Sequence, residues 1–264
     1  MNVEEHFLGS FGLGDIVFPY IKSYGIFLEK GINTNIIFEW EKDWKIPVNI
    51  NDSYNVETIQ NITNSYMNKY YNFNANVTNI YGADPNVEPS VTRLRKINFN
   101  IINKRPVKKK HIVWWDYDRN VNTRATRKWK KVTDYKISAI IRFLELYNPD
   151  YTFSYISYRD DMDYIYKEME SAEFCIGYDG FALMLAKLFN VPALVFRNGS
   201  SDGSTDVFAK MFATTYFQCP WAFQEISPIM LLENTLDDIV YHGTYMMNKI
   251  LAELREKRLN NVQK

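Results

Sequence analysis

In the first forty residues, the apolar positions form a short continuous run and then recur with the period of a helix. Residues 6–8 form a short apolar run, and over 16–28 the apolar side chains recur at the spacing of one helical face. Pro19 falls in the first turns of this expected helix, where proline is tolerated. Gly31 is a typical residue to end it, and 35–40 then predicts a strand. This order of strand, glycine turn, helix and strand is typical of a parallel α/β layer.

The next sixty residues carry a weaker pattern. Within 41–103, a polar helix is expected near 55–70, a loop at 81–85, and one more strand or short helix over 94–102. The segment 104–110 is basic and interrupted by proline, which is typical of a connector between domains.

The second half alternates more regularly between strand and helix patterns. This alternation predicts a second parallel sheet with right-handed crossovers. A long amphipathic helix is expected from 236 to about 258. The expected strands cover 111–115, 151–156, 174–176 and 191–196, and the expected helices cover 134–146, 160–169 and 182–189.

Composition and charge restrict the class of protein. Hydrophobic residues make up 46% and charged residues 23% of the 264 positions, as in folded proteins. The 31 basic and 31 acidic residues cancel, which excludes a protein that coats polyanions but leaves room for a local basic groove. Two cysteines cannot form a disulfide framework or a four-cysteine zinc site. With no secretory signal and no run of 18 apolar residues, we expect a cytoplasmic protein without a transmembrane segment.

Two glycine turns before helices are candidate anion sites. Glycines at 9, 12 and 14 precede Asp15, and Gly177-Tyr178-Asp179-Gly180 precedes the 182–189 helix. Glycine lets the backbone approach a ligand closely, and a helix start offers unpaired N–H groups to an anion. Helix capping is the alternative role for Asp15 and Asp179.

Two further segments follow expected strands. After 111–115 come the acidic pair Asp116-x-Asp118 and the cations Arg119, Arg124, Arg127 and Lys128. The cations are suited to clamp a diphosphate, with a solvated loop as the alternative. Such an acidic pair holds a divalent metal in some nucleotide-sugar enzymes, but we expect no metal. The loop 198–205, with Ser200 and Ser201, follows 191–196 at the end where open α/β sheets bind ligands, and a flexible loop is its alternative.

Remaining reactive side chains are expected to be structural. His6, His111 and His242 lack metal-ligand spacing and stand in no nucleophile motif. Cys175 lies in an apolar run that predicts a small core residue.

Taken in order, three of these pieces resemble the heptosyltransferase-type glycosyltransferases of the GT-B fold. The pieces are the Gly-Asp pair Gly14-Asp15 opening a helix, Arg127-Lys128-Trp129 ahead of a helix, and Cys175–Pro192 with its glycine turn and Leu185-Ala186. The family carries a small hydroxyl residue where Gly180 follows Asp179 directly, and it carries a histidine in the following helix where Leu183 or Met184 stands.

The resemblance implies two Rossmann-like lobes with parallel sheets, the N-terminal lobe being trimmed to fit the short chain. We place an acceptor-side lobe at 1–107, a nucleotide-sugar lobe at 108–235, and a helix at 236–264 that packs back across both. The implied reaction is inverting transfer of a sugar from a nucleoside-diphosphate donor to an acceptor hydroxyl, with no cofactor and no metal. Asp15 would be the general base.

The donor diphosphate would lie between the basic segment and the second glycine turn. Arg127 and Lys128 would hold it together with Gly177, Tyr178, Asp179 and Gly180. Gly12, Gly14, Arg124, Ser200 and Ser201 are further candidates to contact donor or acceptor.

Three other readings stay open. The acceptor is a carbohydrate or, because of the basic residues of 104–110 and Arg119, Arg124 and Arg127, a modified base in DNA. The chain is alternatively a non-catalytic nucleotide-sugar-binding module of the same fold. A methyltransferase with its cofactor at 9–14 would need an acidic residue after the next strand, for which Glu39 is the candidate, and would leave the second half unexplained.

Overall fold

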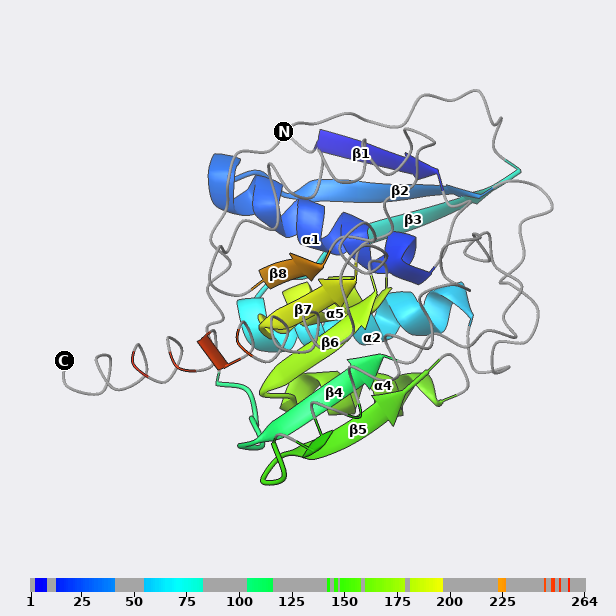
Figure 1. Cartoon of the computed structure of the whole chain (residues 1–264). Coiled ribbons are helices and arrows are strands. Elements are labelled where there is room, and N and C mark those ends of the chain that lie inside the picture. The colour runs from blue at the N-terminus through cyan, green and yellow to red at the C-terminus, as the bar shows by residue number, and fades with distance from the viewer. Residues whose placement is uncertain are drawn as a thin grey trace.

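A computed structural model shows a mixed α/β protein with two parallel β-sheets (Figure 1). The α/β class and the parallel sheets expected from the sequence are therefore confirmed, whereas an arrangement as two GT-B lobes stays a prediction. The structure describes residues 3–8, 13–40, 55–82, 104–115, 142, 145–146, 148–157, 160–178, 181–196, 223–226, 245, 248–249, 252 and 256.

The first sheet, sheet A, is built from the N-terminal third of the chain. Its strands lie in the order β1-β2-β3 and all run parallel, with Phe7 opposite Phe38 and Phe38 opposite Asn79. Each strand is joined to the next by a helix, as a parallel pair requires. The elements are β1 (Val3–Leu8), α1 (Leu13–Lys30), β2 (Thr34–Trp40), α2 (Val56–Tyr71) and β3 (Asn76–Tyr81).

Strand β3 was not expected from the sequence, and Tyr81, expected in a loop, is its last residue. Among the described strands of sheet A, β3 lies at an edge, and all of its residues are exposed or half-buried. An exposed edge strand does not need the apolar run that marks a buried strand. The Asn-rich sequence of β3 therefore gave too weak a signal.

The second sheet, sheet B, has five described strands in the order β5-β4-β6-β7-β8, all parallel. β4 lies between β5 and β6, so the chain runs to one side of β4 and then crosses to the other. This reversal is the topological switch point of a doubly wound sheet. The elements are β4 (His111–Trp115), β5 (Thr152–Ile156), α4 (Met162–Ser171), β6 (Phe174–Tyr178), α5 (Phe181–Leu188), β7 (Ala193–Phe196) and β8 (Phe223–Ile226).

Helix α1 is buried at every residue from 16 to 26 rather than on one face. It ends where expected, because Gly31 adopts a φ of +66° and donates its N–H to Phe27 O at 2.8 Å. Pro19 is the seventh residue of a helix that begins at Leu13, at the end of its second turn. Proline has no N–H to donate to the carbonyl of Asp15 four residues earlier.

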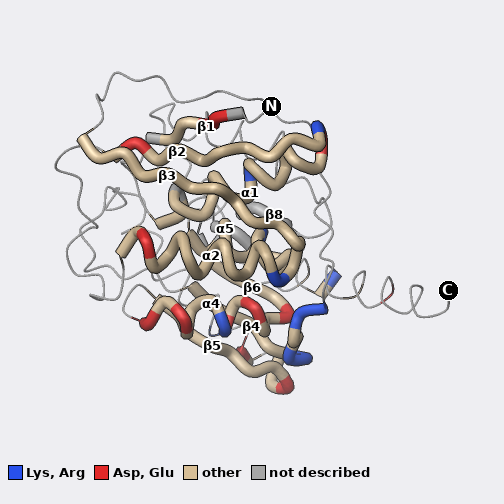
Figure 2. Tube along the Cα trace, turned by 180° about the vertical axis from the view of Figure 1, so that it is seen from behind, with Lys and Arg blue, Asp and Glu red and all other residues tan. Residues whose placement is uncertain are grey.

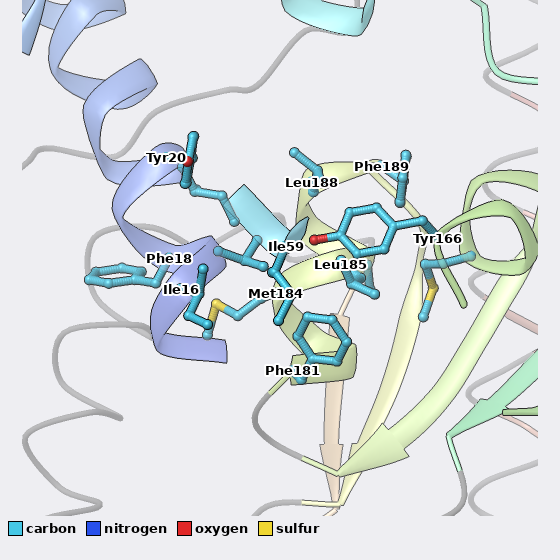
Figure 3. Packing of buried hydrophobic residues seen from close by; sticks show 14 of the residues in the cluster. Ile16, Phe18, Tyr20, Ile59, Tyr166, Phe181, Met184, Leu185, Leu188 and Phe189 are labelled. Atoms are coloured by element: carbon cyan, nitrogen blue, oxygen red, sulfur yellow. The ribbon is translucent and has the colours of Figure 1, made fainter. Parts of the chain in front are cut away.

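Four helices form one apolar layer, and its buried residues share one core with residues of both sheets. α1 packs against β2 of sheet A, and it also packs against α2 and α5. Aromatic rings continue the layer: Tyr66 of α2 lies 5.4 Å from Tyr166 of α4 and 4.9 Å from Phe189 after α5, measured between ring centres. Figure 3 shows Ile59, Tyr166 and Phe189 in this shared core. Residues of both sheets thus bury one another, and the boundaries expected at 107 and 235 remain predictions.

Candidate ligand-binding edge

All described strands point to the same side of the molecule, so both sheets end at one common edge (Figure 1). We call this side the carboxyl edge; it holds the last residues of β1, β4, β6 and β7 and the first residues of α1 and α5. Open α/β sheets bind ligands outside the carboxyl ends of their strands, at the switch point. The switch point between β4 and β6 lies on this edge.

Helices α1 and α5 begin side by side at the carboxyl edge. Figure 3 shows Ile16, in the first turn of α1, next to Met184 of α5, with Phe181 at the start of α5 close by. All three side chains are buried. Because the first four N–H groups of a helix lack intrahelical partners, two helix starts together favour a negatively charged ligand.

Asp15 is the third residue of α1, and Gly14 is the second. The backbone therefore places the expected base at the carboxyl edge, in the turn that packs against α5. The side-chain position of Asp15 lies outside what the structure describes, so its role stays a prediction.

Gly177 has a packing role that the sequence did not suggest. It is the fourth residue of β6, and a Cβ atom added there would lie 3.0 Å from Trp115 Cβ in β4 and 3.4 Å from Ala182 Cβ in α5. A side chain at this position would force its neighbours to shift by a few tenths of an ångström, so glycine favours the close approach of β4, β6 and α5 at the switch point. Tyr178, the last residue of β6, pairs with Phe196 of β7 through the backbone.

We expect Gly177→Ala to destabilise the protein by about 1–3 kcal/mol, because the added methyl group overpacks a rigid site. Urea denaturation of the variant and the wild type measures this difference. An unchanged unfolding midpoint combined with weaker nucleotide binding would assign Gly177 to the ligand instead of the packing.

The other expected site residues lie outside the described residues. They are Gly12, Arg124, Arg127, Lys128, Asp179, Gly180, Ser200 and Ser201. Trp115 and Phe196, the last residues of β4 and β7, stand at the carboxyl edge and lead into two of these segments.

The basic segment 104–110 lies at the opposite edge, before β4 begins, where Figure 2 shows Lys and Arg positions gathered. Arg105 Nη1 donates to Glu170 O at 2.6 Å and to Ala172 O at 3.1 Å, at the C-terminal end of α4. Lys110 Nζ lies 2.8 Å from Asp150 Oδ2. Cations at the end of a helix offset the partial negative charge of its carbonyls, so part of this basic segment serves the fold.

His111 belongs to the same opposite edge and joins three elements. Its Nδ1 lies 2.9 Å from Thr152 Oγ1 in β5, and its Nε2 lies 3.1 Å from Glu168 Oε2 in α4. Burial alone would raise the pKa of Glu168, but hydrogen bonds from Ser154 and His111 and the charge of Lys108 outweigh burial and lower it. The structural role expected for His111 is confirmed.

The lowered pKa of Glu168 predicts acid sensitivity. A carboxylate with a lowered pKa in the folded state stabilises the protein above its unfolded pKa, near 4.5, and this contribution is lost as the pH falls through the folded value. We expect the free energy of unfolding to fall on acidification, and Glu168→Gln to remove part of that dependence. Urea midpoints measured between about pH 3 and pH 6 test this; equal pH slopes in the variant and the wild type would contradict it.

Sheet A contains ionic contacts that sequence reasoning missed. Glu5 and Lys22 are both buried, with 2.6 Å between Oε2 and Nζ. His6 Nδ1 lies 2.5 Å from the buried Glu39 Oε1, and the structural role expected for His6 stays a prediction. The sequence indicated a polar residue in this strand, because Glu5 lies in the segment 3–8, which has apolar residues at both ends. A polar residue alone does not identify its partner.

Cys175 is buried in β6, and burial raises the pKa of its thiol to about 12, so its expected role as a core residue is confirmed. Over the described ranges, His, Cys, Asp and Glu side chains form no group of three or more arranged to hold a metal ion. No helix within those same ranges has the length and apolar character needed to cross a membrane.

Comparisons with protein-family models, with curated proteins and with solved structures gave no match to this chain.

Proposed function

We propose that the protein is a glycosyltransferase that moves a sugar from a nucleoside-diphosphate donor to an acceptor hydroxyl, with inversion. The observation that supports this is the carboxyl edge. There α1, with Asp15 in its first turn, begins beside α5, and the switch point of sheet B lies on the same edge. The helix that follows β1 thus supplies a carboxylate, and the helix that follows β6 supplies an N-terminus of the kind that binds phosphate.

The proposed chemistry divides between the two sheets. Asp15 takes the proton of the acceptor hydroxyl as that oxygen attacks the anomeric carbon and the nucleoside diphosphate leaves. N–H groups of the turn before α5, together with Arg127 and Lys128, stabilise the charge that grows on the leaving diphosphate. In this proposal the two sheets are the cores of two GT-B lobes, and the ligand cleft opens at the carboxyl edge beyond the packed helices.

The acceptor we propose is a carbohydrate rather than DNA. The DNA alternative depended partly on the basic segment 104–110, which begins sheet B at the edge opposite the proposed site. Its residues Arg105 and Lys110 contact α4 and Asp150. Cations that contact phosphates position a duplex, so they are expected on the same face as the reacting site rather than at the opposite edge; retention on duplex DNA at low salt would reverse this choice.

A thermal-shift screen of nucleoside diphosphates tests the proposal. A ligand present at about 100 times its Kd should stabilise the protein by about 2.7 kcal/mol. We expect at least one diphosphate to raise Tm while its nucleoside does not, because the proposed contacts are to phosphate. Stabilisation without any sugar transfer would favour the binding module, and no stabilisation by any diphosphate would contradict the proposal.

A further inference from the structure

Two directional polar contacts hold α1 against sheet A. Lys22 Nζ lies 2.6 Å from Glu5 Oε2 in β1, and each of these side chains is 2% exposed. One residue further along α1, the hydroxyl of Ser23 bonds to that of Thr34 at the start of β2. The Lys22 ammonium also lies 5.0 Å from the centre of the Phe7 ring. Adjacent residues of the helix are thus tied to two neighbouring strands.

These polar contacts have a specific structural role because α1 is buried. Because α1 is buried from 16 to 26, packed side chains surround it on all sides. Apolar packing is not directional, so by itself it fixes the rotation and the axial position of a helix weakly. A buried charge pair removes that freedom, since a slipped helix would leave two charges unpaired in the interior.

We propose that Glu5 and Lys22 are a positioning pair that fixes α1 along its axis and thereby sets where Asp15 stands at the carboxyl edge. This inference rests on the proposed function, because the pair acts through the proposed base. Helix α1 is continuous from Leu13 to Lys30 through Pro19, and Asp15 precedes Lys22 by about two helical turns, so a shift of the helix at Lys22 also displaces Asp15. A misplacement of about 1 Å at a reacting group costs on the order of 100-fold in rate.

The double variant Glu5→Leu/Lys22→Met separates positioning from stability. It removes both charges and keeps similar side-chain volumes, so Tm should stay at or above that of the wild type. We expect kcat for sugar transfer to fall by about 100-fold, with KM for the donor unchanged, because the proposed donor contacts lie on sheet B. An unchanged kcat, or a fall in kcat that accompanies a large loss of Tm, would overturn the positioning role.

A control variant uses a second ion pair that has the same N···O distance. Lys69 Nζ also lies 2.6 Å from a glutamate, Glu170, but Lys69 is 54% exposed and joins α2 to α4. Lys69→Met/Glu170→Gln keeps an acceptor for the hydroxyl of Tyr70, which donates to Glu170, and should leave kcat unchanged. An equal loss of kcat in this control would overturn the assignment to Glu5 and Lys22.

Hydrogen exchange of the α1 amides tests the positioning role without a measurement of activity. In Glu5→Leu/Lys22→Met we expect faster exchange along α1 and unchanged exchange along α4. If the wild type transfers no sugar and binds no nucleoside diphosphate, the proposed function is wrong, and this comparison alone then decides whether the pair fixes α1. Unchanged exchange along α1 would overturn the proposal in either case.

Discussion

Asp15→Asn should reduce sugar transfer by about 10²–10⁴-fold, the range for loss of a general base. The amide has nearly the size of the carboxylate but does not take a proton from the acceptor hydroxyl. Because the diphosphate contacts are proposed for the α5 side, nucleotide affinity should be unchanged. Initial rates of nucleoside-diphosphate release, with titrations of the same nucleotide, measure the two effects separately.

A control from the same helix makes this result specific. Glu29→Gln exchanges a carboxylate for an amide at the exposed end of α1, far from the carboxyl edge. It should leave the rate and Tm close to those of the wild type. Product formation that survives in Asp15→Asn would show that Asp15, the third residue of α1, is an acidic residue of the first helical turn and not the base.

Phe189→Ala should destabilise the protein by about 3–5 kcal/mol, the usual cost of removing a buried phenylalanine. Phe189 is fully buried, and its ring meets Tyr66, Tyr70 and Tyr166 edge to face, with 4.9 Å, 6.0 Å and 6.1 Å between ring centres. Tyr66 and Tyr70 come from α2, beside sheet A, whereas Tyr166 and Phe189 come from the chain that forms sheet B. Edge-to-face pairs add to the cost of lost burial.

Because this cluster joins both halves, the whole protein should unfold in one transition, with Tm lowered by roughly 2–4 °C for each kcal/mol. Differential scanning calorimetry of the variant and the wild type tests both points. Tyr164→Ala removes a half-exposed ring from α4 and should change stability by less than about 0.5 kcal/mol. Two separate transitions, of which Phe189→Ala shifts only one, would mean that the halves fold independently.

The local sequence pattern was sufficient to predict an element where the residues of that element alone showed its type and its bounds. The runs at 35–40 and 111–115 are apolar because both strands are buried, and their bounds agree with β2 and β4 to within a residue. Gly31 ended α1 as expected because glycine adopts a positive φ without strain. β3 was missed because it pairs with a single strand among those that the structure describes and has an exposed face, and such a strand needs no apolar run.

The local sequence pattern predicted only part of the candidate site. The sequence marked Gly14 and Gly177 as residues of glycine turns before helices, but Gly14 lies inside α1 and Gly177 inside β6, because the helix begins earlier and the strand ends later than the local pattern predicted. The packing of Trp115 against Gly177 was not predictable, because the two residues are 62 positions apart and meet only through strand pairing. The pairing of Glu5 with Lys22 was hidden in the same way.

The sequence by itself thus determined the α/β class, most of the parallel strands other than β3 and β8, and most of the helices, because hydrophobic period and turn residues act over a few positions. Only the tertiary structure decided the strand order with its switch point, the burial of α1 on all sides, and the place of the basic segment 104–110 away from the candidate site. Those features depend on which faces of distant elements bury one another. Such a choice is set by the total apolar surface removed from water and by the polar partners met in the interior, and no short segment contains that information.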